Sequence, residues 1–141
     1  MILVRPLRKS LLPGEAMLKE DPDREEVDRF IVEEIESVPH LEALLLLWKR
    51  QPNQWSPQEM ADALYVSTSA AEPILLDLKQ RGFAKLESGK YSYHATGERS
   101  ELIAKVDRTY RRELVRISTM IHAKPSAAVR AFARAFRFTK D

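Results

Sequence analysis

The most constraining feature of this sequence is the start of a short helix at residues 56–59, which read Ser-Pro-Gln-Glu. Ser56 is a helix-capping residue, proline suits the first helical position because its missing N–H needs no partner there, and Glu59 is spaced to bond back to the cap. A second cap, Ser67, follows closely, so the first helix must be short. Gly82 then ends the second helix in the left-handed conformation that glycine adopts freely. This order predicts two helices joined by a tight turn.

Directly after Gly82 the apolar period changes from helical to two. Residues 83–86 and 91–94 alternate around Glu-Ser-Gly-Lys at 87–90, which predicts a β-hairpin. The polar turn and the short strands are typical of a small wing that follows the second helix.

Helices are predicted on both sides of this unit. Asp21-Pro22 starts an amphipathic helix, and Pro39 restarts the chain as a nearly all-apolar helix. After Gly97 one continuous helix is predicted as far as Ala123, which would span ~40 Å at 1.5 Å per residue. Residues 126–140 predict a last, basic amphipathic helix.

These patterns divide the chain into segments and predict a mainly α fold with a small β-hairpin wing. The predicted segments are a mobile N-terminal arm at 1–20, an N-terminal helix at 21–37, a winged helix-turn-helix at 38–97, a long C-terminal helix at 98–124 and a basic amphipathic tail at 125–141.

The spacing of caps and apolar residues carries a family resemblance. The positions concerned read Ser56, Ala61, Leu64, Val66-Ser67, Leu75, Leu78 and Gly82. The stretch from about residue 39 to 97 resembles the bacterial winged helix-turn-helix regulators. The flanking helices resemble the layout of the multiple-antibiotic-resistance regulator (MarR) family, in which they pair two subunits. This resemblance implies a DNA-binding transcriptional regulator that acts as a dimer.

In a helix-turn-helix, the N-terminal residues of the second helix enter the major groove. We therefore expect the following residues to face the bases: Ser67, Thr68, Ser69 and Glu72. The residues expected at the DNA backbone, some of them on the wing, are Lys79, Arg81, Lys85, Ser88 and Lys90.

Two observations keep a second function open. The predicted outward positions at 68–70 and 72–74 include no Arg, Lys, Asn or Gln, the residues that make paired contacts to guanine and adenine. Residues 38–97 hold 6 basic and 6 acidic side chains, so the winged unit is neutral. The alternative is a protein–protein interaction adaptor with little or no DNA binding, which meets its partner through Glu72, Pro73 and Ile74. The two functions differ in whether the C-terminal arginines share a face with Lys85 and Lys90.

A homodimer is predicted from the long helix and the N-terminal helix. Its contact residues are expected to be Phe30, Ile35, Leu102, Val106, Tyr110, Leu114, Ile117 and Ile121. A monomer in which the long helix folds back on the chain is the alternative. Residues 98–141 hold 11 basic and 5 acidic side chains. This segment can dock on the protein, follow a nucleic-acid backbone or, weakly, lie on a membrane.

Other chemistry finds little support. The chain has no cysteine, its three histidines are far apart, and its four glycines never cluster. Thiolate catalysis, cysteine-based zinc sites and phosphate-cradling glycine loops are therefore not expected, and we predict no metal, no cofactor and no enzyme activity. The longest apolar run, at 43–48, is far too short to span a membrane. We expect a cytoplasmic protein with no membrane partner.

Overall fold

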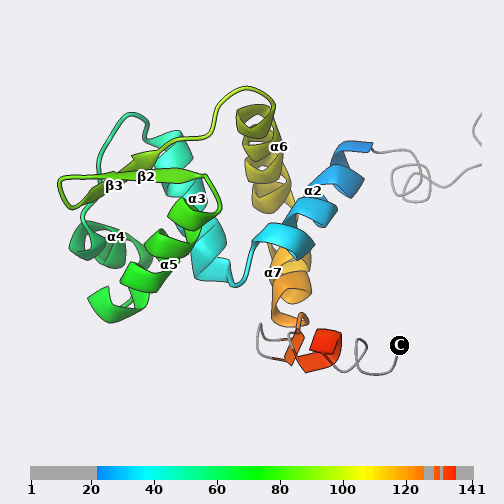
Figure 1. Ribbon diagram of the computed structural model, residues 1–141. Coiled ribbons are helices and arrows are strands. Elements are labelled where there is room, and N and C mark those ends of the chain that lie inside the picture. The colour runs from blue at the N-terminus through cyan, green and yellow to red at the C-terminus, as the bar shows by residue number, and fades with distance from the viewer. Residues whose placement is uncertain (1–21, 126–128, 131, 136–141) are drawn as a thin grey trace, which may run out of the picture.

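The computed structural model describes residues 22–125, 129–130 and 132–135. In chain order its elements are α2 (Pro22–Glu34), α3 (Val38–Lys49), α4 (Pro57–Leu64), α5 (Thr68–Gln80), β2 (Ala84–Glu87), β3 (Lys90–Tyr93), α6 (Glu98–Arg112) and α7 (Leu114–His122). Figure 1 shows α4, α5 and the hairpin on one side of α3, and α2, α6 and α7 on the other. The predicted arm at 1–20 and part of the predicted tail lie outside the described residues.

The two caps that define the helix-turn-helix are confirmed. The backbone N–H of Glu59 donates to Ser56 Oγ at 3.1 Å, and the N–H of Ser56 donates to Glu59 Oε1 at 2.8 Å, which completes a capping box. Ser67 Oγ accepts from the N–H of Ala70 at 3.1 Å and so begins α5. Tyr65 makes the turn between the helices in the left-handed region, with φ 59° and ψ 43°. The motif is a helix-turn-helix.

Gly82 ends α5 and connects it to the hairpin. Its φ of +89° lets the N–H of Phe83 reach the carbonyl of Leu78 at 2.9 Å, which is the bond that closes a Schellman motif. The antiparallel strands pair Ala84 with Tyr93 and Glu87 with Lys90, around a two-residue turn. The fold is therefore a winged helix-turn-helix, with strands displaced by one residue from the predicted 83–86 and 91–94.

The core forms around α3, which is apolar on nearly all sides. Its N-cap is Ser37, so the helix begins at Val38 with proline at its second position, one residue before the predicted start. Leu41, Leu44 and Leu47 are fully buried. Phe30 of α2 meets Phe83 edge to face, with ring centroids 5.6 Å apart. This contact joins the N-terminal helix to the base of the wing.

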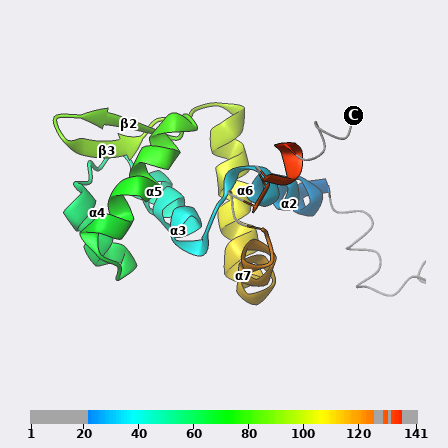
Figure 2. The same ribbon diagram turned by 60° about the horizontal axis from the view of Figure 1, so that its bottom comes forward.

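The predicted single helix from 97 to 123 is wrong, because the chain forms two helices. Glu113 takes φ −129° and ψ 47°, which separates α6 from α7. Its carboxylate is held by Arg24 at 3.1 Å and by Arg116 at 2.5 Å. After the break, Ile117 and Ile121 point back into the core, whereas Leu114 is 51% exposed. Figure 2 shows the two helices running in different directions.

Among the described residues, none of the helices combines the length and the apolar composition that crossing a membrane requires.

Candidate nucleic-acid interface

The outward stripe of α5 and the wing share one face of the molecule (Figure 1). A hollow of about 440 Å³ lies between them. Its wall on the α5 side includes Ser69, Glu72, Pro73 and Leu76, and the wing contributes Leu86 and Gly89. The helix and the hairpin tip can therefore touch the same partner at once.

The N-terminal turn of α5 is held by short polar contacts. Thr68 Oγ1 donates to Gln58 Oε1 of α4 at 2.6 Å, and the hydroxyls of Ser67 and Ser69 lie 3.1 Å apart. Gln58 lies beside the start of α5, and the sequence reasoning did not consider it because it lies inside the capping motif of the preceding helix; its Nε2 also donates to Asp62 Oδ1 at 2.9 Å. An exposed amide at this place is chemically able to pair with adenine. Of the four predicted base-facing residues, Thr68 is half-buried and bonded to α4, whereas Ser67, Ser69 and Glu72 are exposed.

Three exposed lysines surround this face. Lys79 lies in the last turn of α5, and Lys85 and Lys90 lie on the two strands of the wing. Lys90 Nζ is 3.9 Å from Glu59 Oε1. A backbone hydrogen bond from Ser56, together with the charge of Lys90, lowers the pKa of the Glu59 carboxyl. Glu59 therefore stays ionised and partly cancels the lysine that approaches it.

Arg81, which was expected at the DNA backbone, is paired with carboxylates of the chain itself. Its side chain is 25% exposed and binds carboxylates of three segments. The distances are 3.0 Å to Asp77, 3.1 Å to Glu34 and 3.4 Å to Glu36. Burial alone would lower the pKa of the Arg81 guanidinium, but these hydrogen bonds outweigh it and raise the pKa. Arg81 joins α5 to α2.

Ile74 was expected to point outward, and this is wrong. It is 6% exposed. Ala71, Ile74, Leu75 and Leu78 follow the spacing of one helix face, so Ile74 completes the apolar side of α5. The exposed apolar residue of this helix is Leu76, at 43%.

Two of the C-terminal arginines, Arg116 and Arg130, are engaged away from the wing lysines. Both views place the hairpin and the C-terminal segment at opposite sides of the molecule (Figures 1 and 2). Arg116 pairs with Asp28 at 2.9 Å, and Arg130 pairs with Glu36 at 2.6 Å. These cations hold α2 in place and add nothing to the charge beside Lys85.

The predicted dimer residues need correction, because most of them are used inside the chain. Six of the eight are buried in the single chain, namely Phe30, Ile35, Val106, Tyr110, Ile117 and Ile121. Their side chains pack between α2, α6 and α7, which is the fold-back that the sequence left open as an alternative. Of the predicted set, only Leu102 and Leu114 keep substantial exposed surface.

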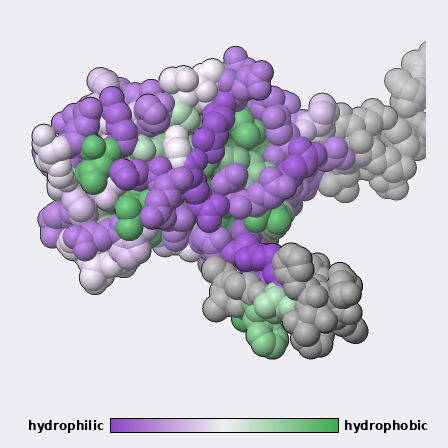
Figure 3. Space-filling model, in the orientation of Figure 1, coloured by the Kyte–Doolittle hydropathy of each residue, from purple (hydrophilic) through white to green (hydrophobic). Residues whose placement is uncertain are grey.

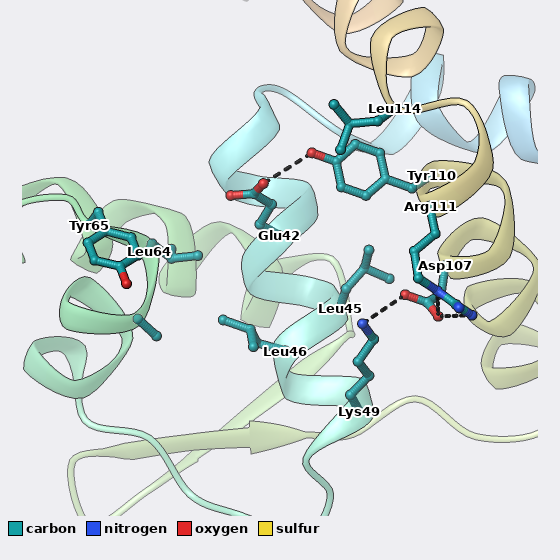
Figure 4. A pocket seen from close by; sticks show the side chains of 11 residues that line it. Glu42, Leu45, Leu46, Lys49, Leu64, Tyr65, Asp107, Tyr110, Arg111 and Leu114 are labelled. Carbon is teal, nitrogen blue, oxygen red and sulfur yellow. Dashed lines mark hydrogen bonds and ion pairs between the residues drawn. The ribbon is translucent and has the colours of Figure 1, made fainter.

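A second hollow of about 440 Å³ lies between α3, the end of α4 and α6 (Figure 4). Tyr110 Oη donates to Glu42 Oε2 at 3.1 Å across its upper end. At the lower end, Lys49 Nζ lies 3.3 Å from the buried Asp107 Oδ1. Burial, followed by the charge of Glu42, raises the pKa of the Tyr110 phenol. Within the part of the chain that the structure describes, no group of three or more His, Cys, Asp or Glu could hold a metal ion.

No protein-family model matches this sequence, and no curated protein matches it. Among solved structures, the chain is similar to a MarR family protein of Mycobacterium tuberculosis, at TM-score 0.48 and 20% identity over 92% of this chain and 95% of that one. It is also similar to a MarR family protein from Bacillus stearothermophilus, at TM-score 0.47 and 13% identity over 96% of each chain. A third is MepR, a transcription regulator of a Staphylococcus aureus multidrug efflux pump, at TM-score 0.46 and 13% identity over 92% of this chain and 96% of that one.

Proposed function

We propose that this chain is a DNA-binding transcriptional regulator that contacts double-stranded DNA through α5 and the wing. The observation that carries the proposal is that the exposed stripe of α5 and a wing with two lysines lie on one face. The helix end at 68–69 is free of bulky side chains, so it can approach base edges closely. Glu72 can accept a hydrogen bond from a cytosine amino group.

The binding energy in this proposal comes from few phosphate contacts. Lys79, Lys85 and Lys90 are the cations expected at this face. Three carboxylates lie close to it: Glu59 is 3.9 Å from Lys90, Glu72 lines the hollow, and Glu87 is the cross-strand neighbour of Lys90. Each phosphate contact contributes about 0.9 to the slope of log affinity against log salt. We therefore expect a slope of about −3 per subunit, which is small for a specific DNA-binding protein.

The test is competition between genomic DNA fragments and random DNA at several salt concentrations. We expect a specific fragment to outcompete random DNA, and Lys85→Ala/Lys90→Ala to reduce the slope by about 2. The control is Arg29→Ala/Arg134→Ala, which removes the same charge from exposed positions away from the wing and leaves the slope unchanged. If no fragment outcompetes random DNA and the lysine pair has no effect, the regulator proposal is wrong.

We further propose that the regulator is a dimer. The exposed aliphatic side chains at the break between α6 and α7 are Leu114, at 51%, and Val115, at 74%. Two adjacent apolar side chains at a corner of the molecule favour burial against a second copy, and two-fold pairing is the commonest way to achieve this.

Two observations favour a second candidate function, that of a protein-binding adaptor. The first is that Arg116 and Arg130 are paired with Asp28 and Glu36 and do not add to the charge beside the wing lysines, which is the arrangement expected of the adaptor. The second is an apolar contribution to the same face. Leu76 and Leu86 are 43% and 41% exposed, and both line the hollow between α5 and the wing. Figure 3 shows hydrophobic spots within the mainly hydrophilic surface on the side of the hairpin and α5. Under this function, Leu76→Ser/Leu86→Ser abolishes capture of the protein partner and Lys85→Ala/Lys90→Ala does not. Under the DNA function, Lys85→Ala/Lys90→Ala weakens DNA binding and Leu76→Ser/Leu86→Ser does not.

A further inference from the structure

A recessed, basic hollow lies between the first turn of α2 and the C-terminal half of α6. Its volume is about 250 Å³, and it is more enclosed than the hollow beside α5. The cationic residues of its wall are Arg24, Lys105, Arg108 and Arg112. The wall also includes the carboxylates of Asp23 and Glu113 and the side chain of Thr109. We refer to it as the basic hollow.

Both carboxylates of the basic hollow already have cationic partners. Asp23 Oδ1 is 3.2 Å from Lys105 Nζ, which also lies 3.0 Å from Glu26 Oε1. Glu113 Oε1 is 3.1 Å from Arg24 Nη2 and 2.5 Å from Arg116 Nε. Hydrogen bonds from Lys105 to the carboxylates of Glu26 and Asp23 raise the pKa of the Lys105 ammonium, which therefore stays charged. These pairs fix Arg24 and Lys105 at the wall and leave no carboxylate for the two remaining arginines.

Those remaining arginines, Arg108 and Arg112, have no ion pair among the described residues. They are one turn apart on α6, so their like charges face each other unfavourably. An anion between them replaces this repulsion with charge-assisted hydrogen bonds. The planar guanidinium group presents paired N–H donors that match the oxygens of a phosphate.

We propose that the basic hollow binds the phosphate group of a small phosphorylated molecule. Arg108 and Arg112 are the direct donors, and Lys105 and Thr109 lie beside them. Four cations against two carboxylates leave a net charge of +2 at the wall. A phosphate ester carries about −1.5 to −2 at pH 7, so it complements this charge better than a single carboxylate does.

The size and place of the basic hollow argue for a small ligand. Pockets that enclose drug-sized molecules measure about 300–1,000 Å³, so a volume of about 250 Å³ suits a phosphorylated fragment. Figure 1 places α2 and α6 away from the hairpin, so this site is separate from the proposed DNA face and does not depend on it.

The test is isothermal titration of the full chain with pyrophosphate and with inorganic phosphate at constant ionic strength. We expect saturable binding that Arg108→Gln/Arg112→Gln weakens at least tenfold. Arg29→Gln/Arg134→Gln lowers the net charge equally at exposed positions outside the basic hollow, and we expect affinity within twofold of the original chain. Arg112→Lys keeps the charge but removes the planar donor pair, so its affinity should lie between that of the original chain and that of Arg108→Gln/Arg112→Gln. Circular dichroism verifies that each variant is folded.

Several outcomes would overturn the proposal. Absence of saturable binding would mean that the basic hollow is not a phosphate site. An equal loss of affinity in both double variants would mean a general counterion effect. Equal affinity for malonate would show that the site does not select phosphate. A change of sedimentation in Arg108→Gln/Arg112→Gln, with pyrophosphate affinity unchanged, would make these arginines part of a subunit interface. Loss of DNA binding with pyrophosphate affinity unchanged would place them at nucleic acid instead.

Discussion

At the scale of single residues, the turn of the helix-turn-helix depends on an unusual tyrosine. Tyr65 adopts φ 59° and ψ 43° and is 95% exposed, so its ring contributes almost no burial to offset the backbone strain. A non-glycine residue in the left-handed region costs roughly 1–2 kcal/mol.

We predict that Tyr65→Gly raises the free energy of unfolding by about 0.5–1 kcal/mol, because relief of strain exceeds the added chain entropy. Ala63→Gly is the matched control. It introduces glycine two residues earlier, at an exposed helical position, and should lower the free energy by about 1 kcal/mol. Urea denaturation of the three proteins measures both effects, and a loss of stability in Tyr65→Gly would contradict the strain argument.

His40 connects the cap of α3 to α5. Its Nδ1 lies 2.6 Å from Ser37 Oγ, and its Nε2 lies 3.5 Å from Asp77 Oδ2. A neutral ring with its proton on Nε2 satisfies both contacts. Burial lowers the pKa of His40, although the charges of Asp77 and Glu36 act in the opposite direction.

We therefore predict a loss of stability in mild acid. Because the folded pKa is lowered, the unfolded chain binds the proton first, so the free energy of unfolding falls as pH drops below about 6.5, the unfolded histidine value. In His40→Gln this fall between pH 7 and 5.5 should disappear. Denaturant titrations at each pH measure it, and identical slopes in the two proteins would rule the mechanism out.

A separate loss is expected at lower pH. Burial by itself raises the pKa of the Glu36 carboxyl, but the hydrogen bonds and charge of Arg130, with Lys124 and Arg81, outweigh burial and lower it. This contribution is complete above about pH 4.3, the unfolded glutamate value, and is lost as pH falls through the lower folded value. The Glu36 contribution is complete in the range from pH 7 to 5.5, so the part of the His40 effect that falls in this range can be measured without it.

At the scale of elements, the sequence predicted those features that depend on neighbours in the chain. The capping box at Ser56, the stop at Gly82 and the hairpin turn at 88–89 are local hydrogen-bond and torsion preferences, and each is confirmed. The break at Glu113 is different. The chain has neither glycine nor proline there, and the carboxylate is held by Arg24, far away in sequence.

The two errors at the candidate site have different origins. Arg81 seemed a phosphate contact because it is a cation near the end of α5, but its carboxylate partners Glu34 and Glu36 lie at the end of α2 and just after it, far away in sequence. Ile74 was placed outward although its spacing from Ala71 and Leu78 was visible in the sequence. Long-range ion pairs have no periodic signature, whereas the burial of Ile74 could have been predicted from spacing alone.

At the scale of the whole molecule, the winged unit is tied to the flanking helices at several points. Phe30 packs on Phe83, Arg81 joins Glu34 and Glu36, and Arg130 binds Glu36 in turn. Lys124 donates to the carbonyls of Ile31 and Ile35 at the end of α2. Phe30 was expected at a second subunit, and here it packs within the chain. Among the described residues, Leu114 and Val115 at the corner between α6 and α7 are adjacent and exposed.

That corner gives the last prediction, which concerns assembly. If a second copy covers Leu114 and Val115, the chain sediments as a dimer at micromolar concentration, and Leu114→Ser/Val115→Ser shifts it to a monomer. The variant should remain folded, because both side chains are largely exposed in the single chain and their replacement opens no cavity. Leu76→Ser/Leu86→Ser removes two exposed leucines from the other side of the molecule and serves as the control, with the dimer retained. Sedimentation of the original chain as a monomer across this range would contradict dimerisation. A dimer that survives Leu114→Ser/Val115→Ser would place the interface elsewhere, because these two side chains could then not be buried at its centre.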